Sequence, residues 1–573
     1  MLENIDIAKI LVETKIFGKA ELAKHQREAQ EKKMGLLDFL LTDKIIDENH
    51  VFEKIAKERY NIPFVDLANE TIRKDILQLI PEPIAQSHSV VAFDEKGGKL
   101  KIATLDPTDL QTFTFIEKKV EKPLEIYYTT PASIENILKQ YHQSLRAEFE
   151  KITRKETAGE QEKLKEMAED LPIIRVVDTL LEYAIFEGAS DIHIEPEEKE
   201  LRIRYRIDGL LREVMTLPKK VHAGLVARIK ILSNLKLDEH RLPQDGRFKI
   251  ETDEYKISFR VSVIPVFDGE KIVMRLLNES GRILTLEQLG FQGGPLEKIK
   301  NNIDKPHGMV LVTGPTGSGK TTTLYTVLNI LNKPGVNITT VEDPIEYRMP
   351  RVNQSQVNPK IGYTFASGLR AFLRQDPDII MVGEIRDKET AEIAINAAMT
   401  GHLVLATLHT NDAATAMPRL QDMKIASFLI ASTVNVIIAQ RLVRKVCPNC
   451  IEKQKLDKEV IKELKQQFDT DQILKTFKEN KLLKAGERDW TSIHFYKGKG
   501  CNQCKDGYKG RMGIYEVLEI TPEIGDLVVK KASSETILRK AMEQGMLTML
   551  TDGMIKAKNG ITTIEEIIRV TKE

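Results

Sequence analysis

The residues with the clearest chemical capacity form a glycine-rich loop between Gly314 and Thr321. The loop reads G-x-x-x-x-G-K-T, follows an apolar strand-like run and precedes an apolar helical run. Glycines let backbone N–H groups point at phosphate oxygens, Lys320 supplies a positive charge, and Thr321 supplies a hydroxyl for Mg²⁺. We therefore predict a nucleoside triphosphate site rather than a chance glycine-rich turn. Its residues are Gly314, Pro315, Thr316, Gly317, Ser318, Gly319, Lys320, Thr321 and Thr322.

Three further segments follow the loop at spacings that suit one RecA-like sheet. The strand-like run 338–342 leads into a cluster of carboxylates, the run 379–382 has an acid just past its end, and the run 403–408 is flanked by histidines. Ligands of open α/β sheets lie beyond the carboxyl ends of strands, so we expect the acids to face the phosphates. One acid would order Mg²⁺ and another would position or deprotonate the attacking water. The candidate catalytic residues are Glu342, Glu346, Glu384, His402 and His409.

Each of these segments alone has a simpler interpretation. An acid at the end of a strand is often the N-cap of the next helix. A histidine beside an apolar strand is more often packed or hydrogen-bonded than catalytic. Because all three segments lie downstream of a phosphate loop, one NTPase site explains them better together.

All four cysteines fall into two C-x-x-C pairs, Cys447 with Cys450 and Cys501 with Cys504. In a cytosolic chain this pattern favours a metal site, because thiols stay reduced there. Four thiolates in a tetrahedron select Zn²⁺ and leave no open position, so the site would be structural. The long separation of the two pairs predicts an inserted element, helical over Leu456–Lys478. A redox pair of dithiols is the competing interpretation.

Length and composition bound the class of protein. The 573 residues suggest three to five domains. Lys plus Arg equal Asp plus Glu at 85 each, whereas a dedicated nucleic-acid binder usually carries a basic excess. The longest apolar run, Phe428–Ala439, is too short and too interrupted to span a membrane, and the acidic N-terminus is unlike a signal peptide. We expect a soluble cytoplasmic chain.

Composition also divides the chain into segments. More than half of residues 146–170 are charged, which predicts a solvated helix or a flexible linker. The predicted segments are an N-terminal domain (1–145), a charged linker (146–170), an α+β domain (171–283), a RecA-like ATPase domain (284–446), a zinc-binding lobe (447–504) and a C-terminal helical region (505–573).

Hydrophobic periodicity predicts the secondary structure before the phosphate loop. Residues 1 to about 60 have helical periodicity. Arg202, Arg204 and Arg206 share one face of a predicted strand, which is either solvated or turned toward a partner or nucleotide. The predicted strands are 90–93, 100–104, 124–128, 191–195, 201–207, 256–263 and 271–277, and the predicted helices are 109–119, 133–141 and 173–186.

The combined motifs resemble the secretion ATPases of type IV pilus and type II secretion systems. Residues Val341–Tyr347 are similar to their acidic box, Arg374–Arg386 to their Walker B region and Thr400–Asn411 to their histidine box. Upstream, Ala189–Pro196 and Tyr205–Gly209 resemble the domain that precedes the motor. The resemblance implies an α/β fold in which a RecA-like P-loop motor follows a smaller α+β (PAS-like) domain and an N-terminal helical plus α/β docking domain, with a four-cysteine zinc lobe.

The resemblance also implies an activity and partners. It implies a homo-hexameric ring that hydrolyses ATP with Mg²⁺ and turns an inner-membrane platform protein. The ring would be cytoplasmic and peripheral at the inner face of the cytoplasmic membrane, with no nucleic-acid partner. A glutamate of the acidic box would activate water, with Glu346 favoured over Glu342, and Glu384 would assist Mg²⁺ coordination.

Four arginines are candidates to neutralise charge that develops on the γ-phosphate. By the resemblance, Arg260 and Arg275 of the preceding domain would swing toward the phosphates. Arg370 and Arg374 would act from the motor, within or across subunits. The alternative for Arg370 and Arg374 is an ordinary polar helix face that ends before Pro377.

Several functions compete within and outside this family. The long N-terminal region, the four cysteines and their wide gap favour pilus assembly, with type II secretion as the alternative. A nucleic-acid translocase is a third hypothesis, which the neutral charge and the single tryptophan disfavour. A nucleotide-binding scaffold without turnover is a fourth.

The N-terminal region contains one altered copy of a ligand motif. Residues Lys33–Leu37 and Asn61–Leu67 resemble parts of a domain that binds cyclic di-GMP in some relatives through two copies of an Arg-Leu-Gly-led motif. Here Lys33 and Met34 replace arginine and leucine, and lysine cannot stack on guanine or bind it bidentately as arginine can. We predict no tight binding of cyclic di-GMP and a docking role instead.

Overall fold

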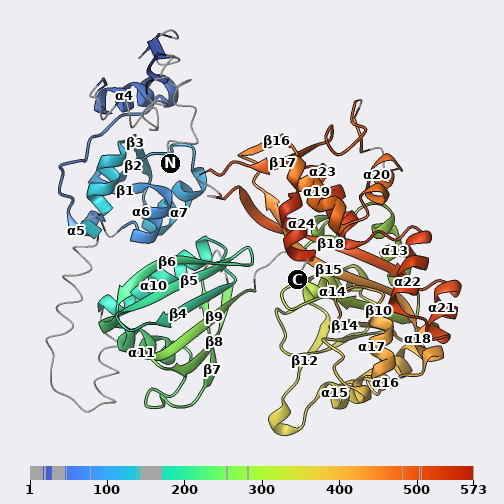
Figure 1. Cartoon of the computed structure of the whole chain (residues 1–573). Helices are drawn as coiled ribbons and strands as arrows, with labels where there is room; N and C mark the ends of the chain where they lie inside the picture. The colour runs from blue at the N-terminus through green and yellow to red at the C-terminus, as the bar shows by residue number, and fades with distance from the viewer. Residues whose placement is uncertain are drawn as a thin grey trace. The chain divides into compact units, whose positions relative to one another are not determined.

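Figure 1 shows a computed structural model of the chain. The described residues form two compact units, one made mainly of residues up to Leu277 and the other mainly of residues from Asn278 onward. Within them no helix is long and apolar enough to cross a bilayer. The structure describes scattered residues between 17 and 46, then 48–141 except 78 and 139, and 171–571 except 253–255, 280–282, 480–481, 485, 502–503 and 505.

Two predicted features lie outside the described residues. These are the charged linker 146–170 and the motif at Lys33–Leu37. The predicted helical periodicity of the first 60 residues is described only in part, where α4 (Glu48–Ile55) and the π-helical turn η2 (Ala56–Tyr60) lie.

The first unit begins with a small three-stranded sheet of order β1-β2-β3. Its strands are β1 (Val90–Lys96), β2 (Lys99–Thr104) and β3 (Leu124–Tyr128). The β1–β2 hairpin closes on Gly97 and Gly98, both with positive φ, as a tight two-residue turn requires. Strand β3 runs parallel to β2, so the chain crosses over through α7 (Leu110–Val120). These elements and the helix over 131–138 confirm the predicted ones, and α5 (Lys74–Leu77) and α6 (Glu82–His88) precede them.

A six-stranded sheet of order β6-β5-β4-β9-β8-β7 completes the first unit. Side chains alternate along β8, where Ile257, Phe259, Val261 and Val263 are buried in a core shared with two helices. All the strands and the helix predicted here are confirmed. The elements are α10 (Leu171–Phe186), β4 (Asp191–Pro196), β5 (Glu200–Ile207), β6 (Leu210–Pro218), η3 (Lys219–Val221), α11 (His222–Leu232), β7 (Gln244–Glu251), β8 (Lys256–Val266) and β9 (Gly269–Asn278).

The three arginines on one face of β5 are ion-paired within the sheet. Arg202 lies 3.2 Å from Glu197, Arg204 donates at 2.7 Å to Glu195, and Arg206 lies 3.6 Å from Asp191. These ion pairs occupy the face in this structure, and a role toward a partner or nucleotide stays a prediction.

The second unit contains a seven-stranded sheet of order β12-β11-β13-β14-β10-β15-β18. Neighbours are parallel from β12 to β15, and only β18 is antiparallel. Strands β10, β11, β13 and β14 are buried along their whole length, as expected for parallel strands covered on both faces. The strands are β10 (Gly308–Thr313), β11 (Ile338–Glu342), β12 (Val352–Gln356), β13 (Ile379–Val382), β14 (Leu403–Leu408), β15 (Val434–Val446) and β18 (Tyr508–Glu519).

Alternate residues of this sheet enter two separate cores. Met309 and Leu311 of β10 pack in one core, whereas Val310 and Val312 pack in the other. The first core lies beneath α16 and the second beneath α14, so helices cover both faces. The helices before the last strand are α12 (Leu286–Leu289), α13 (Gly293–Ile303), α14 (Lys320–Leu331), η4 (Pro359–Ile361), α15 (Phe365–Phe372), α16 (Lys388–Met399), α17 (Ala416–Asp422) and α18 (Ser427–Thr433).

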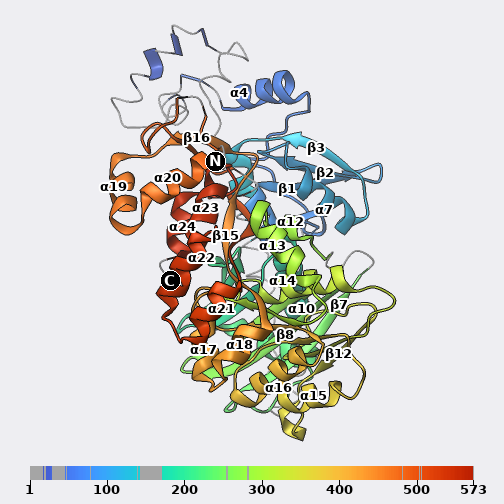
Figure 2. The same cartoon turned by 90° about the vertical axis from the view of Figure 1, so that its right-hand side faces the viewer.

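Between the cysteine pairs the chain forms a small lobe with a sheet of two antiparallel strands, β16 and β17, which are separated in sequence by two helices. The predicted helix over 456–478 is two helices, because the chain is extended at Phe468. Figure 2 shows both helices beside the C-terminal helices. Phe477 and Trp490 of the lobe share a hydrophobic core with Met554, which lies in the C-terminal helix Met549–Lys558. The elements are β16 (Ile451–Lys455), α19 (Lys458–Gln467), α20 (Thr470–Glu479), β17 (His494–Gly498), and, after β18, α21 (Pro522–Val529), α22 (Ser534–Glu543), α23 (Met549–Lys558) and α24 (Ile564–Thr571).

A buried ion pair joins this lobe to α23. The Lys558 ammonium donates to both carboxylate oxygens of Glu487 at 2.7 Å, and both side chains are almost fully buried. Burial alone would raise the pKa of Glu487, but hydrogen bonds from the Lys484 N–H and from Lys558 lower it to about 2. The pair therefore stabilises the fold above the usual glutamate pKa of 4.5, and this stabilisation is lost as the pH falls toward 2.

We expect Lys558→Met to lower the free energy of unfolding of this lobe by about 3–5 kcal/mol, because it leaves a buried carboxylate without its partner. Denaturant unfolding at neutral pH measures the loss. The control is Lys475→Met, since Lys475 is an exposed lysine 3.9 Å from Glu479 and should change stability by less than about 1 kcal/mol. Equal effects of the two changes would contradict the role given to the buried pair.

Candidate active site

The phosphate loop joins the buried strand β10 to helix α14. Three of its glycines have positive φ, 144° at Gly314, 78° at Gly317 and 90° at Gly319. A Cβ at Gly314 would lie 2.4 Å from the backbone oxygen of Gln440, so only glycine fits there. Pro315, Thr316, Gly317 and Thr322 are exposed, whereas Gly314 and Ser318 are buried and Gly319, Lys320 and Thr321 are half-buried.

Lys320 is folded back over its own loop. Its ammonium donates to the carbonyl of Gly314 at 2.8 Å and to that of Pro315 at 3.1 Å. Burial lowers the pKa of Lys320, and attraction by Glu384 acts in the opposite direction. Glu384, the acid that follows β13, therefore acts electrostatically on the Lys320 ammonium.

Gln440 of β15 fixes the loop from the neighbouring strand. Its side chain, 1 % exposed, donates to the carbonyl of Ser318 at 2.8 Å and accepts from the Thr323 hydroxyl at 2.8 Å. One amide therefore ties the loop to the first turn of α14. Gln440 was not among the predicted site residues, although a glutamine inside the apolar run of β15 is a visible signal.

Glu342, at the end of β11, is enclosed by hydrogen-bond donors. It is 2 % exposed and accepts from the Thr340 hydroxyl at 2.5 Å, from the Gln354 amide at 3.2 Å and from the Tyr325 hydroxyl. Burial raises the pKa of Glu342, and these donors partly oppose the rise. Glu346 is half-buried, and its N–H donates to the same Tyr325 hydroxyl at 3.4 Å.

Glu384 follows β13 and is 9 % exposed. It accepts from His409 Nε2 at 3.2 Å and is ion-paired with Arg386. His409 comes directly after β14, which pairs with both β13 and β10. The structure therefore brings Glu384, His409 and Lys320 together at the carboxyl edge of the sheet.

His402 lies at the opposite end of the sheet, so its predicted place in the site is wrong. Leu403 pairs with Gly308 at the start of β10, whereas the phosphate loop follows the other end, roughly 17 Å along the strand. The His402 ring donates to the Ala397 carbonyl at 2.9 Å, where α16 ends. Its role in this structure is to join that helix to β14.

The two motor arginines contact neighbours on the α15–α16 side of the sheet. Arg370 is ion-paired with Glu389 in the first turn of α16 and is exposed. Arg374 donates to the Arg370 carbonyl at 3.0 Å. Neither contact reaches the phosphate loop, so action on the phosphates stays a prediction for both.

The arginines predicted in the first unit have different surroundings. Arg275 donates to Asp191 at 2.9 Å. Arg260 lies directly opposite Arg247 in the β7–β8 register, while Phe248 and Phe259 stack on the other face. Both arginines are exposed, and like charges in direct cross-strand register repel each other. Arg247 was not among the predicted residues, because the register of paired strands is not visible in sequence.

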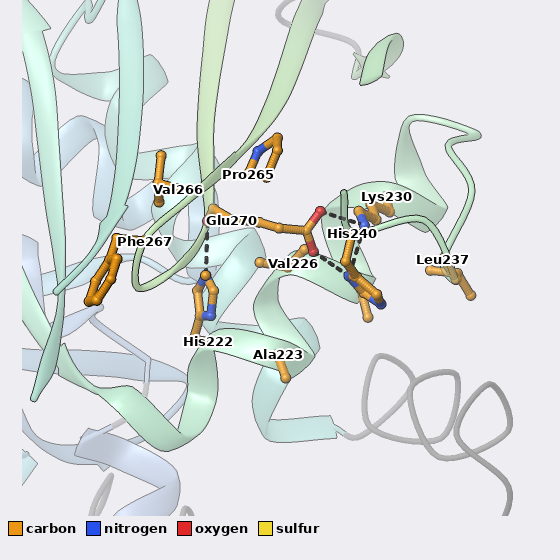
Figure 3. Close-up of a pocket in the computed structure, with 12 residues that line it drawn as sticks. His222, Ala223, Val226, Lys230, Leu237, His240, Pro265, Val266, Phe267 and Glu270 are labelled. Carbon is orange, nitrogen blue, oxygen red and sulfur yellow. Dashed lines mark hydrogen bonds and ion pairs between the residues drawn. The ribbon is translucent and has the colours of Figure 1, made fainter. Parts of the chain in front are cut away.

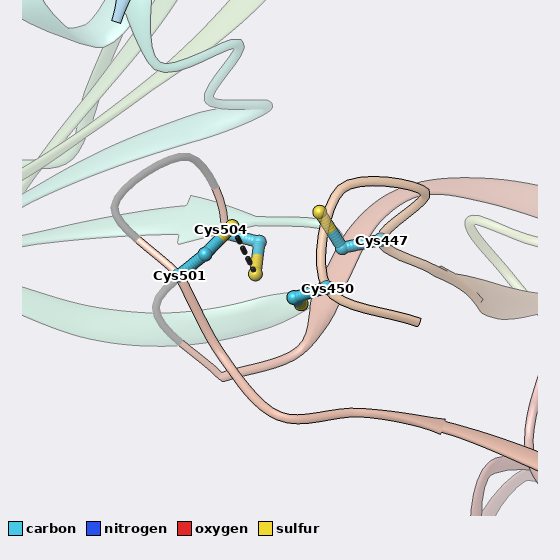
Figure 4. Close-up of side chains that lie close together, drawn as sticks. All are labelled: Cys447, Cys450, Cys501 and Cys504. Carbon is cyan, nitrogen blue, oxygen red and sulfur yellow. Dashed lines mark hydrogen bonds between the residues drawn. The ribbon is translucent and has the colours of Figure 1, made fainter. Parts of the chain in front are cut away.

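Figure 4 shows that the two cysteine pairs come together, as predicted from their spacing. One candidate ligand atom from each of the four lies within 4.8 Å of the others. Tetrahedral zinc–sulfur bonds of about 2.3 Å give sulfur–sulfur edges of about 3.8 Å, close to the 3.5 Å between the sulfurs of Cys501 and Cys504. The four thiols can therefore hold a tetrahedral zinc ion with small adjustments.

A cavity of about 360 Å³ lies in the first unit and is shown in Figure 3. Its polar groups satisfy one another, since Glu270 accepts from Lys230 at 2.7 Å and from His240 at 2.6 Å. The remaining lining is largely apolar and includes the fully exposed Phe267. None of its lining residues belongs to the predicted nucleotide site.

Comparison with known proteins gives matches along nearly the whole chain. Residues 166–569 match a family described as type II/IV secretion system protein, and residues 60–148 match the MshEN domain. The type IV pilus assembly ATPase PilB of Myxococcus xanthus is 39% identical over 581 residues, which covers 98% of each chain. The type II secretion system ATPase E of Vibrio cholerae is 40% identical over 497 residues, or 84% of this chain and 94% of that one.

Among solved structures, the ATPase DotB of Legionella pneumophila resembles this chain with a TM-score of 0.50 and 23% identity. The likeness covers 69% of this chain and 95% of that one and concerns the fold.

We expect Gln440→Leu to weaken ADP binding about tenfold, because the Ser318 carbonyl and the Thr323 hydroxyl lose their partner and the loop loses its support. Calorimetric titration of the full chain measures the affinity. Asn435→Leu is the matched control, since Asn435 lies at the other end of β15 and donates to His307. Unchanged ADP affinity in a folded Gln440→Leu protein would contradict this role.

Proposed function

Because this chain belongs to the type II/IV secretion system protein family, we propose that its ATPase activity drives assembly of type IV pili. The chain is an ATP hydrolase by this membership. The observation that carries the proposal is the meeting of Lys320, Glu384 and His409 at one sheet edge, in a chain that matches a pilus assembly ATPase along 98% of its length. The proposed assembly is a cytoplasmic homo-hexamer that acts on an inner-membrane platform protein.

The phosphate loop would hold the triphosphate through its backbone N–H groups. The helix start at Lys320 adds a partial positive charge, and the Lys320 ammonium would leave its loop carbonyls for the β- and γ-phosphates. Thr321 and Glu384 would hold Mg²⁺, which neutralises phosphate charge when bound. Arg260 and Arg275 are the proposed further cations that would neutralise charge on the γ-phosphate.

Glu346 is the proposed base for the attacking water. Glu342 already accepts from three side chains, so its lone pairs are directed at Thr340, Tyr325 and Gln354. Glu346 is less buried and lies on the segment just beyond the strand end. The shared Tyr325 hydroxyl would let Glu342 orient this segment.

We expect Glu346→Gln to lower kcat roughly 10²- to 10⁴-fold while nucleotide affinity stays near that of the wild type, since the amide cannot take a proton. Phosphate release and ADP titration on the purified chain measure the two quantities. Glu342→Gln should cost less activity. A larger loss of kcat in Glu342→Gln than in Glu346→Gln would reverse the assignment.

Type II secretion is the second candidate function, favoured by the 40% identity to the Vibrio cholerae ATPase E. The wide gap between the cysteine pairs, filled by α19 and α20, supports pilus assembly. Deletion of the gene in its host, with surface pili and secreted protein scored together, tests the choice. Loss of pili restored by the wild type supports pilus assembly, whereas intact pili with trapped secreted enzymes would assign the protein to type II secretion.

A structural zinc ion is proposed for the four cysteines. We expect about one equivalent of zinc per chain in freshly purified protein, because four thiolates leave no open position and select this metal. Elemental analysis measures it. Cys501→Ser should reduce the zinc content while Lys320→Ala should not, and less than half an equivalent in the wild type would contradict the proposal.

A further inference from the structure

A buried carboxylate on β18, Glu516, bonds two distant segments of the motor unit. It is 6 % exposed, and its two oxygens accept different backbone N–H groups, that of Ala413 at 3.1 Å and that of Met549 at 3.2 Å. Burying a carboxylate is costly unless donors compensate it. Ala413 and Met549 are more than a hundred residues apart in the chain. The Glu516 side chain therefore links two distant segments through one hydrogen bond to each.

The first of these segments is the loop that follows β14. His409 bonds Glu384, and the N–H of Thr410 donates to the Thr313 hydroxyl at 2.8 Å, at the base of the phosphate loop. The hydroxyls of Thr410 and Thr313 also lie 2.7 Å apart. Residues 409–413 are therefore held at one end by nucleotide-site residues and at the other end by Glu516.

The second segment is the start of the C-terminal helix α23. Met549 is its first residue, and a carboxylate placed there is favoured by the helix dipole. The same helix holds β18 through two more contacts, from the Tyr515 N–H to Asp552 at 2.9 Å and from Lys556 to the Gly513 carbonyl at 2.6 Å. Helix α23 is thus fixed to the strand that carries Glu516.

We propose that Glu516 is a positioning residue that couples the loop carrying His409 to the C-terminal helix α23. A movement of residues 409–413 when nucleotide binds or is hydrolysed then shifts the start of α23, and a displacement of α23 changes the placement of His409 and Glu384. The inference rests on the proposed function, because it gives the ATPase a mechanical connection from its nucleotide site to the C-terminal helices.

The contact to α23 can be removed by changing one backbone donor. Met549→Pro deletes the N–H that Glu516 accepts, and proline is tolerated at the first position of a helix. Thr548 before it has extended dihedral angles, which a following proline prefers. Met549→Ala shortens the same side chain but keeps the N–H, so the difference between the two variants isolates the hydrogen bond.

We expect Met549→Pro to have a kcat for ATP roughly tenfold below that of Met549→Ala, with KM changed less than about twofold, because misplaced catalytic groups slow the chemical step more than they weaken binding. Hydrogen–deuterium exchange on the full chain with Mg²⁺ and AMP-PNP gives a second measurement. Nucleotide should protect both residues 409–413 and the start of α23 in the wild type and in Met549→Ala. In Met549→Pro it should protect only residues 409–413.

A second pair of variants covers the case in which Met549→Pro does not fold. Glu516→Gln removes one of the two acceptors, and Glu519→Gln makes the same change further along β18, where Glu519 bonds Asn302. We expect Glu516→Gln to differ from Glu519→Gln in kcat and in hydrogen–deuterium exchange as Met549→Pro differs from Met549→Ala. Equal kcat and equal protection within the pair used would overturn the inference, whereas no phosphate release from the wild type would instead refute the proposed function.

Discussion

The proposed activity depends on one constraint, that the glycine-rich phosphate loop keeps its shape at the carboxyl edge of the seven-stranded sheet. Three glycines with positive φ give the loop its shape, but they also leave it with few side-chain contacts. The Gln440 amide supplies the missing support through the Ser318 carbonyl and the Thr323 hydroxyl. Because Gln440 lies on β15, the phosphate loop is fixed by the strand that continues to the first cysteine pair and pairs with β18. The loop, the cysteine lobe and the C-terminal helices are therefore all connected to the antiparallel strand pair β15–β18.

Three buried carboxylates around this strand pair and the sheet edge are held by different donors. Glu342 is bound by side-chain hydroxyls and an amide, Glu384 by His409 and Arg386, and Glu516 by two backbone N–H groups. These donors suit different tasks. Glu384 is ion-paired with Arg386 and attracts Lys320 of the phosphate loop, which fits a place next to metal and phosphate. Glu342 and Glu516 are enclosed by hydrogen-bond donors, which suits residues that orient neighbouring segments.

Local patterns in the sequence were sufficient for most elements and for part of the site. Alternation in the first unit and fully apolar runs in the motor sheet predicted the strands, because each pattern reports how many faces of a strand are buried. The positions of the phosphate loop and of Glu384 at the ends of β10 and β13 were predictable because each lies next to its strand in the chain. His402 was wrongly included because His402 and His409 flank β14 equally closely in sequence. Only the carboxyl end of β14, where His409 lies, is next to the phosphate loop. Gln440, Arg247 and Glu516 depend on strand register and long-range contacts, which no local pattern contains.

The central claim is that ATP is bound and hydrolysed at the loop that carries Lys320. The most direct test measures phosphate release from Mg-ATP by the purified full chain and by Lys320→Ala, side by side with zinc content as a check on folding. The account predicts steady turnover by the wild type and none by the variant, with equal zinc in both. Turnover by Lys320→Ala at the wild-type rate would contradict it.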